Sequence, residues 1–142
     1  MKHKSLAKIM VAAAAMLMTF TLPGSAQCQE RLTFEAPFAF RANGVDMPAG
    51  QYSTDPNYVS RTVLLRAIDG KPAVFVACGA GRTIKERDSV YGLTFTLIGK
   101  TYLLTSIWEG EREYKVNLPK ADSKMLEARN VVPDKTFIIA HR

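Results

Sequence analysis

Apolar residues recur at every second position over long stretches of the chain, which is typical of β-strands that bury one face. The first series consists of Leu32, Phe34, Ala36, Phe38, Phe40 and Ala42. Pro37 interrupts it and has no backbone N–H, so we expect an edge or a bend there. Asn43 and Gly44 then predict a tight turn.

Two pairs of apolar segments predict β-hairpins. The arms and turns are residues 63–68 and 72–78 around Asp69–Gly70, and residues 90–98 and 101–108 around Gly99–Lys100. Both dipeptides suit the positive backbone angles of a two-residue hairpin turn.

Shorter patterns predict the remaining strands and one helix. They are a strand at 51–54, a strand at 114–118 ended by Pro119, a short helix at 121–129 capped by Asp122 or Ser123, and a last strand at 136–140. No helix is long enough to connect parallel strands. The sequence therefore predicts an all-β fold, a small antiparallel sandwich or barrel of about 7–8 strands with one short helix near the C-terminus.

The first 26 residues differ from the rest. Three lysines precede an apolar run at 9–22, and small residues lead to Ala26, the order of an export signal peptide. Fourteen helical residues cover roughly 21 Å, less than a hydrocarbon core of about 30 Å, so we expect no permanent membrane span. We predict a signal peptide at 1–26, cleavage near Ala26, a single β-domain at 27–142, and a periplasmic or extracellular location. A buried N-terminal helix and lipidation of Cys28 are the weaker alternatives.

Charge argues against a nucleic-acid partner. The net charge of +6 falls to +3 when the segment at 1–26, which has three lysines and no acid, is removed. The remaining cations are interleaved with acidic residues, which is typical of a solvated surface.

Two cysteines remain after export, Cys28 and Cys78. An oxidising compartment would allow a disulfide between them, which could stabilise the fold by about 4 kcal/mol in the chain-entropy model. Alternatively, Cys78 follows the apolar residues 74–77 and is a small buried hydrophobe. The sequence leaves both readings open.

Catalytic groups are scarce. Beyond the leader, the one imidazole belongs to His141, close to the end of the chain, where a general base is poorly fixed. Neither a close cysteine pair nor a second histidine is available for zinc. We therefore expect no enzyme activity, no metal and no cofactor.

Three acidic residues are the remaining catalytic candidates. On one strand, Glu109, Glu111 and Glu113 would project from one face about 6.6 Å apart, near the spacing of paired glycosidase carboxylates. Charge on one face of a hairpin more often marks a wet surface. Hydrolysis by these residues is a distant alternative.

The strand at 101–108 is apolar on both faces. Alternation places Tyr102, Leu104 and Trp108 on one face, and Leu103 and Ile107 on the other. Such a strand lies at a sandwich centre, lines a barrel cavity for an apolar ligand, or forms a partner surface. We select the first face as the candidate ligand or partner surface.

The opening of the domain also carries a motif. It consists of Pro37, Phe38, Phe40, Asn43, Gly44, Met47, Pro48, Ala49, Gly50 and Tyr52. Together with later matches between residues 93 and 127, it resembles a family of small exported β-rich bacterial proteins of the acidobacterial type, whose pattern is Pro-Phe-x-Phe followed by Leu-Pro-Ala-Gly-x-Tyr. Met47 stands where the pattern has leucine. The resemblance implies an exported β-domain and supplies no catalytic residues.

We therefore expect an exported, non-catalytic β-domain that acts as an envelope or extracellular binding or interaction module, with an envelope protein or polymer as its partner. A small barrel that carries an apolar ligand is the alternative.

Overall fold

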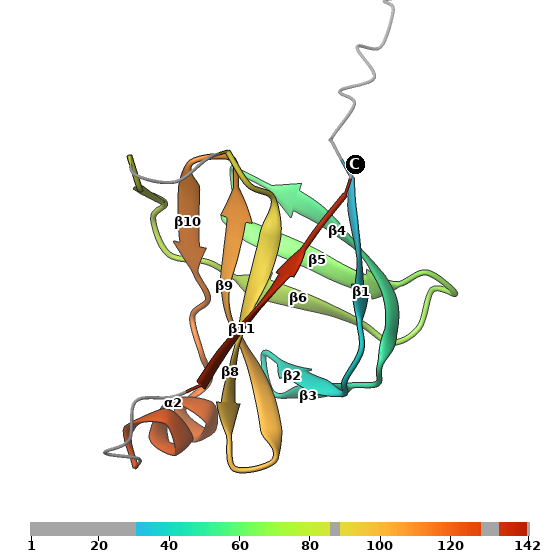
Figure 1. Ribbon diagram of the computed structural model, residues 1–142, viewed down its shortest axis with the longest axis vertical. Helices are drawn as coiled ribbons and strands as arrows, with labels where there is room; N and C mark the ends of the chain where they lie inside the picture. The colour runs from blue at the N-terminus through green and yellow to red at the C-terminus, as the bar shows by residue number, and fades with distance from the viewer. Residues whose placement is uncertain (1–30, 86–88, 129–133, 142) are drawn as a thin grey trace, which may run out of the picture.

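The computed structural model describes residues 31–85, 89–128 and 134–141, which form eleven strands and one helix (Figure 1). A four-stranded antiparallel sheet has the order β1-β4-β5-β6. Its strands are β1 (Leu32–Ala36), β4 (Gly50–Asn57), β5 (Thr62–Ala67) and β6 (Ala73–Ala77).

The second sheet has the order β11-β8-β9-β10-β7. Its strands are β7 (Arg82–Thr83), β8 (Gly92–Ile98), β9 (Thr101–Glu109), β10 (Arg112–Lys115) and β11 (Asp134–Ile139). A short hairpin of β2 (Phe40–Ala42) and β3 (Val45–Met47) joins this sheet, because β2 pairs with β9 in parallel. The short strands β2, β3 and β7 explain why eleven strands are present rather than the predicted seven or eight.

The two sheets meet at both edges, so eight strands form a closed ring. At one junction Gly79 N–H donates to the Lys115 carbonyl and Asn117 N–H donates to the Ala77 carbonyl, each over 2.8 Å. At the other, the amides and carbonyls of Thr33 and His141 exchange two bonds of 2.7 Å. The fold is therefore a small closed barrel flattened into two layers (Figure 1).

Aromatic side chains fill much of the interior. Phe40 packs edge-on against Tyr52 and Phe95, with ring centroids 5.2 and 5.0 Å apart. The predicted alternation of the first series is confirmed, except that the chain leaves the strand at Pro37 and resumes it at Phe40. Phe38, in this break, is only partly buried and stacks on Tyr102 at 3.8 Å.

The predicted turns have different outcomes. Asn43 and Gly44 have φ of 47° and 77° and join β2 to β3, and Gly99 has φ of 66° in the two-residue turn between β8 and β9, as predicted. The prediction of a two-residue turn at Asp69–Gly70 is wrong. Ala67 N–H donates to the Pro72 carbonyl, so the loop has four residues, and Gly70 N–H closes it on the Ala67 carbonyl.

The helix α2 (Lys120–Glu127) overlaps the predicted segment at 121–129, but its predicted caps are wrong. It starts earlier, with Pro119 at the N-cap position and no side-chain cap. This shift puts Asp122 in the first turn, where it is 1% exposed and its Oδ1 lies 3.3 Å from Arg41 Nε of β2. The preceding strand ends at Lys115 rather than at Leu118.

The predicted signal peptide at 1–26 lies outside the described residues. In the part of the chain that the structure describes, no helix has the length and apolar character needed to cross a bilayer.

Candidate functional site

A β-bulge in β9 decides which way its side chains point. Phe95 pairs with Leu104, whereas the preceding Thr94 pairs with Ser106, so Thr105 is an extra residue. Because side chains alternate along a strand, one extra residue reverses the alternation beyond it. Leu104 therefore shares the inner face with Ile107.

The bulge overturns the predicted surface of Tyr102, Leu104 and Trp108. Leu104 is fully buried in the core, and Tyr102 packs partly buried against it. Trp108 lies on the outer face of the sheet, where its indole N–H donates to Thr94 Oγ1 over 2.9 Å. The three side chains thus do not form one surface.

Trp108 belongs to a groove of about 570 Å³ on that outer face, beside α2. Hydroxyl groups form part of its floor, and they already bond within the protein: Thr96 Oγ1 to Thr105 Oγ1 at 3.0 Å, and Ser106 to Glu113 at 2.9 Å. The hydroxyl groups of this groove are therefore already bonded within the protein.

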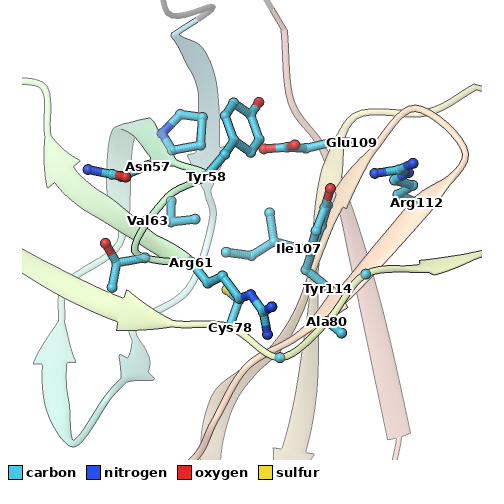
Figure 2. Close-up of a pocket in the computed structure, with 14 residues that line it drawn as sticks. Asn57, Tyr58, Arg61, Val63, Cys78, Ala80, Ile107, Glu109, Arg112 and Tyr114 are labelled. Carbon is cyan, nitrogen blue, oxygen red and sulfur yellow. The ribbon is translucent and has the colours of Figure 1, made fainter.

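A second pocket, of about 270 Å³, lies at one mouth of the barrel (Figure 2). The end of β4, the start of β5, the residues after β6 and the β9–β10 hairpin surround it. Its lining residues are Pro56, Asn57, Tyr58, Arg61, Thr62, Val63, Cys78, Gly79, Ala80, Gly81, Ile107, Glu109, Arg112 and Tyr114.

The floor of this mouth pocket is apolar. Figure 2 shows Val63 from the first sheet facing Ile107 from the second, with Cys78 beneath them. Each of the three is less than a tenth exposed. Burial, with a smaller contribution from the charge of Glu109, raises the pKa of the Cys78 thiol to about 11, so this cysteine is a neutral thiol at physiological pH.

The rim of the pocket is charged. The Glu109 carboxylate, at the end of β9, lies beside the Tyr58 ring (Figure 2). Burial raises the pKa of this carboxyl group, and its hydrogen bond with Tyr58 partly opposes the shift. Arg112 stands directly across the hairpin from Glu109, and Arg61 lies at the side of the mouth.

Local geometry fixes the loop that carries Tyr58. The Asn57 side-chain oxygen accepts bonds of 3.1 Å from both Val59 N–H and Ser60 N–H, which is an Asx-type turn. Arg61 follows with φ of 52°, a left-handed backbone angle. The turn thereby holds Tyr58 and Arg61 on two sides of the pocket.

A close approach also positions Tyr114. A Cβ atom added at Gly81 would lie 2.6 Å from the Tyr114 ring, so only glycine lets the ring rest on the backbone there. Figure 2 shows the Tyr114 hydroxyl directed toward the same side of the mouth as Glu109.

The hairpin separates the three glutamates that the sequence grouped together. Glu109 ends β9 and faces the pocket, whereas Glu113 lies on the outer face of β10 with Ser106 and Arg82. Glu111 is exposed in the turn between them. The expectation of one shared face was wrong because Gly110 and Glu111 reverse the chain.

The other sequence candidates lie apart from the pocket or outside the described residues. The backbone of His141 closes the ring with Thr33, and its side chain is exposed. Cys28 lies outside the described residues, so its pairing with Cys78 stays a prediction. No group of three or more metal-ligating side chains is found among the residues that the structure describes.

The sequence did not single out the mouth pocket, because Cys78 and Glu109 belong to different sheets. A signal was present: Glu109 follows an apolar strand in phase with the inward-facing Ile107, but this phase is visible only once the bulge at Thr105 is known. Comparison with known proteins adds nothing to this geometry, since no family model, curated protein or solved structure matches the chain.

Proposed function

We propose that this protein is a non-catalytic binding module that takes a small amphipathic ligand in the mouth pocket. The observation that carries the proposal is the combination of an apolar floor, formed by Val63, Cys78 and Ile107, with a charged rim. Small-molecule sites are concave, mostly apolar and supplied with a few polar groups that orient the ligand, and the mouth of a barrel is a common place for them.

The packing of the interior limits the size of any apolar ligand that the barrel could carry. Phe38, Phe40, Tyr52 and Phe95 occupy the space between the sheets near the other end. The pocket volume of about 270 Å³ lies just below the range of about 300–1,000 Å³ for drug-sized ligands. These dimensions favour a ligand of few heavy atoms over a long lipid.

Export is the second part of the proposal. The basic, apolar and small-residue order of residues 1–26 supports a signal peptide, and the resemblance to small exported β-rich bacterial proteins supports the same location. The module would then meet its ligand, or an envelope partner, in the periplasm or the medium.

The test uses indole, an uncharged probe of suitable size, and methyl NMR spectra of the protein. Indole should shift the Val63 and Ile107 methyl signals in a saturable way and leave the exposed Ile139 methyl unchanged. Val63→Phe should abolish the shift of the Ile107 methyl signal by filling the pocket while the fold is retained. Equal shifts at Ile139, or none at Val63 and Ile107, would refute the proposal.

A further inference from the structure

We infer that the ligand of the mouth pocket is a small zwitterion with an apolar side chain, such as an apolar α-amino acid. Its ammonium group would bind Glu109, its carboxylate would bind Arg112, and its side chain would lie against Val63 and Ile107. This inference rests on the proposed function and specifies the chemistry of the ligand.

The first support is the state of Glu109. Its carboxylate is half-buried and lies at the pocket, yet no ion pair to it is found in the described ranges, where its partner is the Tyr58 hydroxyl. A partly desolvated carboxylate without a cation is electrostatically unfavourable. A positively charged ligand group at this position would supply the missing counter-charge.

The second support is the state of the two arginines. Among the described residues, neither Arg112 nor Arg61 forms an ion pair, although both line the pocket. A guanidinium group presents paired donors that match a carboxylate. The pocket therefore contains donors for an anion as well as an acceptor for a cation.

The arrangement of these charges selects the ligand class. Glu109 and Arg112 are direct cross-strand partners, and the Cβ atoms of such pairs are about 5 Å apart. A plain amine would meet two guanidinium groups, and a plain anion would place a second negative charge beside Glu109. A molecule that carries both charges close together, such as an α-amino acid with its ammonium and carboxylate groups on one carbon atom, satisfies both sides of the pair.

The floor and the volume of the pocket determine the character and the size of the ligand's side chain. Val63, Ile107 and Cys78 present aliphatic and thiol surface without a charge, since the Cys78 thiol is protonated at physiological pH. A pocket of about 270 Å³ accommodates a ligand the size of one amino acid. Leucine is therefore a suitable probe.

The experiment titrates the full protein with three matched compounds and follows the Val63 and Ile107 methyl signals. L-Leucine carries both charges, 3-methylbutan-1-amine lacks the carboxylate, and 4-methylpentanoate lacks the ammonium group. We expect leucine to bind at least tenfold more tightly than either analogue. An equal affinity for all three compounds would overturn the inference.

Two variants assign the charges. Glu109→Gln should weaken leucine binding about tenfold and leave 4-methylpentanoate binding unchanged or stronger. Arg112→Gln should weaken leucine and 4-methylpentanoate but not the amine. Arg66→Gln, an exposed arginine on the outer face of β5, serves as the control and should change nothing. If Glu109→Gln weakened all three compounds equally, Glu109 would have only a structural role and the inference would fail.

The indole titration separates this inference from the proposed function. Indole binding without preferential leucine binding would refute the zwitterion and leave the small-ligand pocket intact. If neither indole nor leucine shifted the Val63 and Ile107 signals, both the inference and the proposed function would be overturned.

Discussion

The ion pair between Arg41 and Asp122 should contribute measurably to the stability of the folded protein. It joins β2 to α2, the Asp122 carboxylate is 1% exposed, and the Arg41 side chain is 32% exposed. We expect Arg41→Met to destabilise the protein by about 3 kcal/mol, because it leaves a buried carboxylate without a counter-charge while it keeps most of the aliphatic stem.

The magnitude follows from the geometry. Two unit charges 3.3 Å apart attract each other by about 5 kcal/mol at an effective dielectric constant of about 20. The partial exposure of Arg41 reduces this gain, and the Nε–Oδ1 contact is not an aligned hydrogen bond. Removal of one partner of a buried ion pair typically lowers stability by about 3–5 kcal/mol, and we therefore expect a loss at the lower end of this range. Asp122→Asn should cost less, about 1 kcal/mol, because Arg41 can turn toward water.

Urea unfolding followed by the fluorescence of Trp108, the one tryptophan of the chain, measures these changes. Arg31→Met is the matched control, since Arg31 pairs with Asp55 at 2.9 Å on the surface and is 62% exposed. Such surface pairs contribute about 0–1 kcal/mol. If Arg41→Met cost no more than Arg31→Met, the reasoning on the buried charge would be refuted.

Three further predictions concern single positions. Gly92→Ala should lower the free energy of unfolding in urea by about 1–3 kcal/mol, because its Cβ would lie 2.5 Å from a backbone oxygen of β11. Gly79→Ala is the control and should be close to neutral, since its nearest contact would be at 3.7 Å. Equal losses of stability in the two variants would contradict this. Burial raises the pKa of Glu109 in the folded state above its ordinary 4.5. Its ionisation therefore destabilises the folded state as pH rises from about 4.5 through the raised pKa. Glu109→Gln should then gain stability over wild type at pH 7 and lose the advantage near pH 3, and a pH-independent difference would argue against this sign. In a Cys28→Ser background, iodoacetamide at pH 8 should label Cys78 far more slowly in the native protein than in urea, since a pKa of about 11 leaves about one thiolate in a thousand; equal labelling rates would count against a buried neutral thiol.

Local patterns were enough to predict much of the fold. The turns at Asn43–Gly44 and Gly99–Lys100 were predictable because positive φ angles favour glycine and asparagine. The burial of Phe34 and Phe40 followed from alternation alone. The all-β class and the short helix were confirmed for the same reason, since each depends on short-range sequence periodicity.

The site was not predictable, because it depends on two features without a local signal. Nothing around Thr105 marks an extra residue, yet this bulge determines that Leu104 points inward and Trp108 outward. The pocket also needs the bridge between Cys78 and Val116, which follow strands of different sheets, β6 and β10. Long-range pairing of this kind is set by the packing of the whole barrel rather than by neighbouring residues.

The closure of the ring between Thr33 and His141 has a consequence for biosynthesis. These residues are 108 positions apart, and they lie next to each other where β1 begins (Figure 1). A ribosome makes Thr33 well before His141, so this seam of the barrel cannot form until residue 141 has been synthesised. Contacts of such long sequence separation also form slowly. The ring of strands would therefore stay open at this seam until synthesis passes residue 141, whatever hairpins have formed before.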